Sequence, residues 1–194
     1  MRYASAFLAS GFAALAALVA TGATSGIDQW AIDHAMPGAQ FSGRKPSLGD
    51  ALIPLRHVHW HGVVHVVAEI VTLPAAFLPS LLVLVAVRKF VWLIPWAAGT
   101  AIEELCKLTL TRPALYHHGL HLAAFDNAYP SGHTIRAVVI AAAWPAARPW
   151  AVAAIVLLEL SGFHVPTDIV GGLLLALLLS LRLRLRLGLL ALRR

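Results

Sequence analysis

The stretch Pro-Ser-Gly-His-Thr at residues 130–134 ends a polar loop and begins an apolar segment, and His-Val-Pro-Thr-Asp at residues 164–168 does the same further along the chain. His133 and His164 therefore lie at the N-terminal ends of two apolar segments, 31 residues apart. Ionisable groups at membrane depth are costly, so in a hydrophobic chain they are functional candidates by default. The arrangement suits phosphoryl transfer at a membrane surface.

The composition is that of an integral membrane protein. Of the 194 residues, 59% are hydrophobic and 12% are charged, with a mean hydropathy of +0.77, whereas soluble domains carry about 25% charged residues. Most of the cations behind the formal charge of +6 flank apolar segments. There they set topology and meet anionic lipid, so we expect membrane lipids and no nucleic acid as partners. The length fits one transmembrane domain over residues 1–194.

Six apolar segments predict an all-α, polytopic bundle of about six transmembrane helices. The first is longer than the hydrophobic region of a usual signal peptide, so we expect a retained span rather than a cleaved leader. Pro74 and Pro79 should kink the second. The fourth and fifth are short, so either these helices extend further or the site lies below the outer surface. The segments cover roughly residues 6–23, 63–87, 90–107, 133–147, 150–164 and 167–181.

Lysines and arginines are distributed unevenly between the two sides of this predicted bundle. With a cytoplasmic N-terminus, nine fall on the inner side and three on the outer side, which is the bias that orients membrane proteins. Both histidine motifs then face outward, which predicts a protein of the bacterial inner membrane with its site on the outer face. The inner group is Arg2, Arg88, Lys89, Arg148, Arg182, Arg184, Arg186, Arg193 and Arg194, and the outer group is Arg44, Lys45 and Arg56.

The first histidine motif has the features of a phosphate-binding helix start. Ser131 is a good N-cap for the helix that should follow it. The free N–H groups and positive dipole end of that helix suit a phosphate, and Gly132 lets the backbone approach the anion closely. His133 is then placed to protonate a leaving oxygen. The structural alternative is a capped turn with an interfacial histidine.

The second histidine motif combines a candidate nucleophile with a carboxylate. Pro166 fits the first turn of a helix, and Asp168 then lies in that turn, where a carboxylate is favourable. His164 stands close enough to be oriented by Asp168, which would stabilise the cation formed after nucleophilic attack. The alternative is that Asp168 is a helix cap and His164 an interfacial residue.

Two cations lie near the outer end of the third segment. Arg112 and Lys107 are able to clamp phosphate oxygens, arginine as a fork and lysine as a point charge. The alternative is that they are cations that reach toward water from a helix end. Glu103, four residues before Lys107, is placed to pair with it on one helix face.

Together these residues resemble the motifs of the type 2 phosphatidic acid phosphatase family, also called the lipid phosphate phosphatase and haloperoxidase superfamily. The resemblance covers residues 103–172, about a third of the chain. The family has a lysine motif that ends in Arg-Pro, which residues 107–113 resemble. Residues 130–133 match its Pro-Ser-Gly-His motif, and residues 164–172 match the second half of its third motif.

The resemblance implies a metal-independent phosphatase, without a cofactor, that hydrolyses a lipid phosphate or diphosphate. His164 would attack phosphorus and form a phosphohistidine, Asp168 would orient it, and His133 would protonate the leaving group. The substrates that this implies are polyprenyl diphosphates or monophosphates, phosphatidate and phosphatidylglycerophosphate, which belong to isoprenoid lipid and cell-envelope chemistry. The phosphoryl oxygens would be held by Lys107, Ser131 and Gly132.

The chain departs from the family pattern at two arginines. Ala114 stands seven residues after the lysine, and Leu158 stands six residues before the second histidine. Arg112 is a candidate substitute for the first arginine and Arg136 for the second, both as phosphate contacts. An arginine one turn inside an apolar segment needs an anionic partner, which for Arg136 is either Glu159 or the substrate phosphate.

Two other functions remain open at this point. One is a catalytically impaired protein that binds lipid head groups or partners a cell-envelope enzyme, and the other is a small lipid transporter that uses the same polar cleft. Two further histidine clusters have spacings that bind metal in some proteins, but an interfacial position explains them better and we expect no metal site. These clusters are His57, His59, His61 and His65, and His117, His118 and His121.

Overall fold

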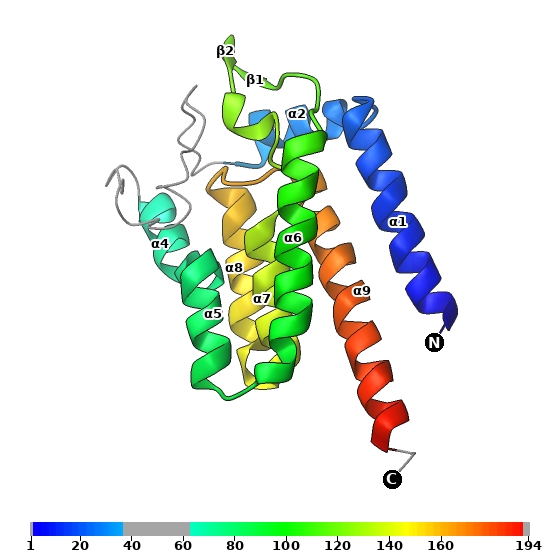
Figure 1. The fold of residues 1–194 in the computed structure, drawn as a ribbon. Helices are drawn as coiled ribbons and strands as arrows, with labels where there is room; N and C mark the ends of the chain where they lie inside the picture. The colour runs from blue at the N-terminus through cyan, green and yellow to red at the C-terminus, as the bar shows by residue number, and fades with distance from the viewer. Residues whose placement is uncertain (1, 37–62, 192–194) are drawn as a thin grey trace.

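The computed structural model describes residues 2–36 and 63–191, which form an all-α bundle with a small β-hairpin at one end (Figure 1). The outer cations Arg44, Lys45 and Arg56 and three of the histidines lie outside the described residues. The helices are α1 (Arg2–Ala20), α2 (Ser25–His34), α4 (Val63–Thr72), α5 (Phe77–Ala86), α6 (Leu93–Thr109), α7 (Gly132–Ala143), α8 (Arg148–Leu160) and α9 (Pro166–Ala191). The hairpin pairs β1 (Tyr116–His117) with β2 (Leu120–His121), and single 3-10 turns lie at Leu73–Ala75, Phe90–Trp92, Ala123–Phe125 and Pro145–Ala147.

The chain passes up and down the bundle as the six-segment prediction requires. In Figure 1, α1, α6 and α8 run toward the end that carries the hairpin, whereas α5, α7 and α9 run away from it. The described residues therefore confirm the all-α bundle and the alternating direction of its helices. Both chain termini lie toward the end opposite the hairpin (Figure 1).

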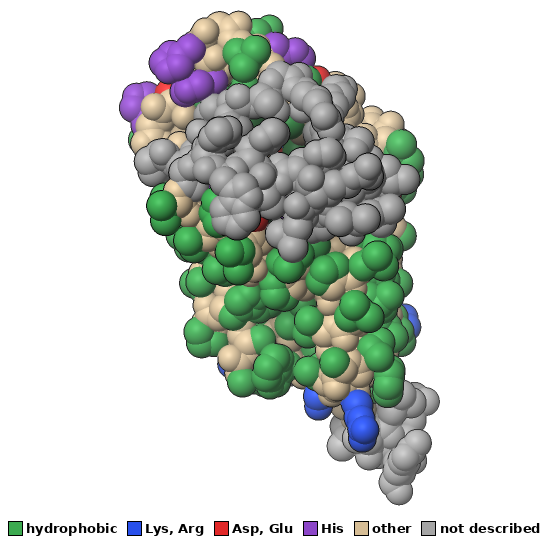
Figure 2. All heavy atoms as spheres, turned by 90° about the vertical axis from the view of Figure 1, so that its left-hand side faces the viewer, with side chains coloured by type: hydrophobic (Ala, Val, Ile, Leu, Met, Phe, Trp, Pro, Cys, Tyr) green, Lys and Arg blue, Asp and Glu red, His purple; other side chains and the backbone are tan. Residues whose placement is uncertain are grey.

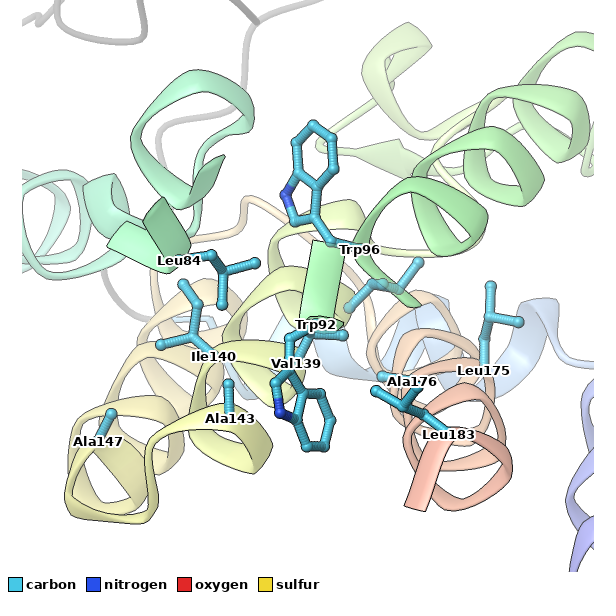
Figure 3. Packing of buried hydrophobic residues seen from close by; sticks show 11 residues of the cluster. Leu84, Trp92, Trp96, Val139, Ile140, Ala143, Ala147, Leu175, Ala176 and Leu183 are labelled. Atoms are coloured by element: carbon cyan, nitrogen blue, oxygen red, sulfur yellow. The ribbon is translucent and has the colours of Figure 1, made fainter. Parts of the chain in front are cut away.

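Helix α7 is the centre of the bundle. It contacts α5, α6, α8 and α9, and nine of its twelve residues are buried. Val139 and Ile140 belong to a core cluster that also contains Leu84 of α5, Trp96 of α6 and Leu175 of α9 (Figure 3). Since α7 is enclosed on several sides, its polar residues have to find partners on the neighbouring helices.

The second span is broken at Pro74, as predicted, whereas Pro79 lies within the first turn of α5. Helices α4 and α5 are separated by the 3-10 turn at Leu73–Ala75, which contains Pro74, and the chain bends by 53° there. By length and composition, Tyr3–Ala20 is able to cross a membrane alone, and the bent pair qualifies if it counts as one span. Helices α7 and α8 have 12 and 13 residues, so at 1.5 Å per residue each is about 20 Å long, short of a hydrocarbon core of about 30 Å.

The surface of the bundle separates apolar sides from polar ends. Figure 2 shows hydrophobic side chains over the face formed by α4 and α5, histidines at the hairpin end, and basic side chains at the opposite end. Large apolar side chains of α4 and α5 are exposed, including Ile70 at 57% and Leu82 at 65%. Such a contiguous apolar surface suits lipid tails rather than water.

Helix α9 is longer than predicted. The sixth apolar segment predicts a helix that ends near residue 181, but the helix continues to Ala191 through the segment in which arginine and leucine alternate. Arg184 lies 5.6 Å above the Trp92 ring and donates a hydrogen bond to the Ala142 carbonyl at 3.1 Å. These contacts fix the basic end of α9 against the rest of the bundle. Helix α1 lies along α9, and the retention of this first span stays a prediction.

Helices α6 and α7 approach each other at Gly99, which gives a first prediction. A Cβ at this position would lie 2.7 Å from Cγ2 of Ile135, which is fully buried. We expect Gly99→Ala to destabilise the protein by about 1–3 kcal/mol, the usual cost of overpacking. Thermal unfolding in detergent measures this change.

Gly26→Ala is the matched control, because Gly26 also lies in a helix but a Cβ there meets nothing within 4 Å. It should be neutral or stabilising by up to about 1 kcal/mol, since alanine is the better helix former. Equal melting temperatures for the two variants would show that the contact with Ile135 is not tight.

Candidate active site

The first histidine motif forms the capped helix start that its sequence predicts. Ser131 is the N-cap of α7, and its Oγ accepts hydrogen bonds from the Thr134 backbone N–H at 3.3 Å and from the Thr134 hydroxyl at 3.0 Å. Ser131 is fully buried. Gly132 and His133 are therefore the first two residues of a central helix, at its positive end.

The second motif lies directly beside the first. Helix α9 begins at Pro166 and carries Asp168 in its first turn, as predicted. The Ser131 backbone N–H donates to the Asp168 carbonyl at 2.9 Å. Gly172 permits this approach, since a Cβ there would lie 2.7 Å from the Ser131 carbonyl oxygen. The two helix starts are thereby held together by backbone contacts.

The two histidines and the aspartate come together as predicted. His164 Nδ1 lies 3.5 Å from Asp168 Oδ2, and the ring centroids of His133 and His164 are 6.2 Å apart. The His164 side chain is only 12% exposed and Asp168 is fully buried. An imidazole whose Nδ1 faces a carboxylate presents Nε2 to a substrate, so the arrangement suits nucleophilic attack with a second imidazole nearby.

Arg112 contacts two carboxylates. One terminal nitrogen, Nη2, donates to Asp168 Oδ1, and the other, Nη1, donates to Asp28 Oδ2 at 3.0 Å. The Arg112 side chain is 2% exposed, so this bridge is shielded from water. Here Arg112 positions the carboxylate that faces His164. A direct contact between Arg112 and a substrate phosphate stays a prediction.

Asp28 is a site residue that the sequence did not reveal. Its Oδ2 accepts a hydrogen bond from the Thr167 hydroxyl at 2.7 Å, and its Oδ1 accepts from the Thr167 backbone N–H at 3.2 Å. Burial raises the pKa of the Asp28 carboxyl, while the Thr167 hydrogen bonds and the Arg112 charge oppose that rise. Asp28 comes from α2, and nothing within its own segment signals a contact with a residue 139 positions away.

Helix α2 is held over the site by an apolar cluster. Ala31 and Ile32 of α2 pack with Leu115 and Phe125 from the loop before α7 and with Val165 at the start of α9. All five are nearly inaccessible to water. This packing fixes the position from which Asp28 reaches the site.

A second buried network lies on the other side of the α7 start. Glu103 pairs with Lys107, as the spacing predicts, and its Oε2 lies 2.7 Å from Arg136 Nη1. Arg136 Nε also donates to the Ala75 carbonyl at 2.7 Å. Of the two partners predicted for Arg136, Glu159 is wrong, because the carboxylate that Arg136 contacts is that of Glu103; a contact between Arg136 and a substrate phosphate stays a prediction. Leu158 of α8 faces the core, and the next residue on a helix is turned by about 100° from it.

The departures from the family pattern leave no cation at the expected positions. Ala114 lies on the surface, and Leu158 is fully buried in the bundle. Arg112 and Arg136 instead approach the site from other elements, each paired with a carboxylate. Within residues 2–36 and 63–191, no group of three or more His, Cys, Asp and Glu side chains is arranged to hold a metal ion.

Among solved structures, the chain is similar to a transmembrane PAP2-type phosphatidylglycerolphosphate phosphatase from Bacillus subtilis. The TM-score is 0.60 at 20% sequence identity, and the alignment covers 94% of this chain and 94% of that chain. The chain therefore has the fold of that protein over nearly its whole length. No protein-family model and no curated protein matches it.

The Arg112 bridge predicts a large effect on stability. Arg112→Met leaves two buried carboxylates, Asp28 and Asp168, without their common cation. Removing one partner of a buried pair costs about 3–5 kcal/mol, so the melting temperature in detergent should fall strongly. Arg186→Met, at an exposed arginine of α9, is the control and should melt like the wild type.

A double variant isolates the cause. Adding Asp28→Asn to Arg112→Met removes one of the two unpaired charges, so it should recover part of the lost stability. Purely additive losses in the two single variants would contradict the bridge.

Proposed function

We propose that this chain belongs to the type 2 phosphatidic acid phosphatase family and is an integral membrane enzyme that hydrolyses a lipid phosphate. The meeting of His133, His164 and Asp168 at two joined helix starts carries this proposal. A protein that only binds lipid has no need of two imidazoles and a buried carboxylate in that arrangement. The shared fold and the apolar face over α4 and α5 support it.

In the first chemical step, Nε2 of His164 attacks phosphorus and the bond between phosphorus and the leaving oxygen breaks. Asp168 accepts the hydrogen bond of the opposite ring nitrogen and stabilises the charge that develops on His164. His133 donates a proton to the leaving alcohol or phosphate. The product is a phosphohistidine on His164.

In the second step, water attacks the phosphohistidine and releases inorganic phosphate. His133, now neutral, takes the proton from that water, so both histidines return to their starting forms. The start of α7 stabilises the phosphoryl oxygens through its free N–H groups and its dipole. Lys107 and Arg136 supply positive charge beside it, with Ser131 and Gly132 shaping the backbone.

The substrate is a lipid whose phosphate reaches the hairpin end of the bundle. We propose a polyprenyl or glycerolipid monophosphate or diphosphate, hydrolysed without metal at the outer face of a bacterial inner membrane. The similar structure is described as a phosphatidylglycerolphosphate phosphatase, so phosphatidylglycerophosphate belongs on the test panel beside polyprenyl diphosphate and phosphatidate.

A second candidate function rests on the missing arginines. Ala114 and Leu158 stand where the family pattern has cations, and each cation near the site already faces a carboxylate. Such a site would bind a phosphate more weakly and stabilise its transition state less. With such a site, the protein would bind lipid head groups or act as the partner of a cell-envelope enzyme.

The decisive experiment measures phosphate release by purified protein in detergent, with a chelator present, over that lipid panel. We expect release by the wild type and a loss of at least about 10³-fold for His164→Ala, since the nucleophile is removed. His34→Ala, at an exposed histidine of α2, should keep full activity. A folded wild type that releases no phosphate from any lipid would favour the head-group-binding function.

Asp168→Asn tests the role of the carboxylate. The amide keeps the shape of the side chain but does not hold His164 in the required tautomer, so kcat should fall by about 10³–10⁴-fold. An Asp168→Asn variant with near wild-type kcat would remove Asp168 from the mechanism.

A further inference from the structure

We infer that Glu103 is an internal competitor for the substrate phosphate, and that binding requires Lys107 to move from Glu103 to the phosphoryl group. The inference rests on the proposed function, because Lys107 and Arg136 are the cations proposed to hold that group. In the structure both cations already contact the same carboxylate.

The position of the Glu103 carboxylate supports this inference. Glu103 is 1% exposed, and its two oxygens divide between Lys107 Nζ and Arg136 Nη1. The carboxylate also lies directly against the start of α7, since a Cβ at Gly132 would overlap it. A carboxylate thus occupies a setting with two cations and a helix N-terminus, which is also the setting that binds phosphate oxygens.

The cations around the site already have carboxylate partners before any substrate enters. Three cations, Lys107, Arg112 and Arg136, face three buried carboxylates, Asp28, Glu103 and Asp168, and the exposed Glu104 also lies 3.8 Å from Lys107 Nζ. A phosphate dianion therefore adds negative charge to a cluster that has no excess of positive charge, unless one cation changes its partner.

Lys107 is the cation that is able to move. Its side chain is 30% exposed and ends in a flexible ammonium group, whereas the Arg136 side chain is 7% exposed and is also held by the Ala75 carbonyl. When the ammonium group moves to a phosphate, Glu103 stays paired with Arg136, so no buried charge is left without a partner. The exchange therefore lowers phosphate affinity without blocking the site.

The test compares binding with Glu103 charged and neutral. In the His164→Ala background, which prevents turnover, calorimetry in detergent measures binding of dioctanoyl phosphatidate and, separately, of inorganic phosphate. Glu103→Gln keeps a hydrogen-bonding oxygen but removes the competing charge. It should tighten binding about tenfold, the scale of one charge-assisted hydrogen bond. Tightening for the lipid alone assigns the site to head groups, whereas tightening for both assigns it to the phosphate itself.

Glu104→Gln is the matched control. Glu104 is the next residue on α6 and lies 3.8 Å from Lys107 Nζ, but it is 61% exposed. The same loss of charge there should change binding less than twofold, because solvent screens an exposed pair. Equal tightening by the two variants would mean that net charge, and not the position of Glu103, controls binding, and would overturn the inference.

A second pair of variants covers the case in which Glu103→Gln does not fold. Glu103→Gln with Arg136→Met removes both buried charges, a change that is often tolerated, and is compared with Arg136→Met alone. The double variant should bind phosphate more tightly than the single variant. Unchanged or weaker binding in folded protein overturns the inference. If the wild type releases no phosphate from any lipid but Glu103→Gln still tightens phosphate binding, the inference about Glu103 stands and the proposed phosphatase activity is rejected.

Discussion

The need to neutralise buried charge governs the hairpin end of this bundle. An unpaired ion in a low-dielectric interior is costly, and burial is tolerated only when a partner is in place. Five charged residues are buried in the described part of the chain, and they fall into two networks that flank the start of α7. One network reaches His164 through its carboxylate, and the other lies against the residue before His133. The five are Asp28, Glu103, Arg112, Arg136 and Asp168.

These networks connect elements that would otherwise be independent. Arg112, in the loop after α6, joins Asp28 of α2 to Asp168 of α9, and Glu103 of α6 meets Arg136 of α7. The apolar cluster under α2 holds the first of them in register. Polar pairing specifies the geometry, while apolar packing supplies the stability that keeps α2 in place. The geometry of the candidate site and the fold therefore depend on the same contacts.

Features decided within a few residues could be predicted from the sequence. The Ser131 cap, Asp168 in the first turn of α9 and the bend at Pro74 each follow from local chemistry. The contacts of Asp28 and Arg136 could not, because they depend on how far each helix is rotated about its axis. A hydrophobic sequence fixes that rotation weakly, since nearly every face of such a helix is apolar. The sequence therefore suggests Glu159 of α8 as the protein partner of Arg136, whereas the partner in the structure is Glu103 of α6.

The unbroken helix α9 fixes the distance between Asp168 and Arg184 along the bundle. Asp168 and Arg184 lie on this one helix, 16 residues apart, which corresponds to about 24 Å along the axis at 1.5 Å per residue. In the orientation that we propose, with Arg184 at the level of the inner head groups, Asp168 would lie several ångströms beneath the opposite boundary of a hydrocarbon core about 30 Å thick. The phosphate of the proposed lipid substrate would then have to lie below the neighbouring head groups, while its chains stay in the surrounding bilayer. A soluble phosphate ester has no such chains to offset the cost of that position, so this depth would by itself favour a lipid substrate.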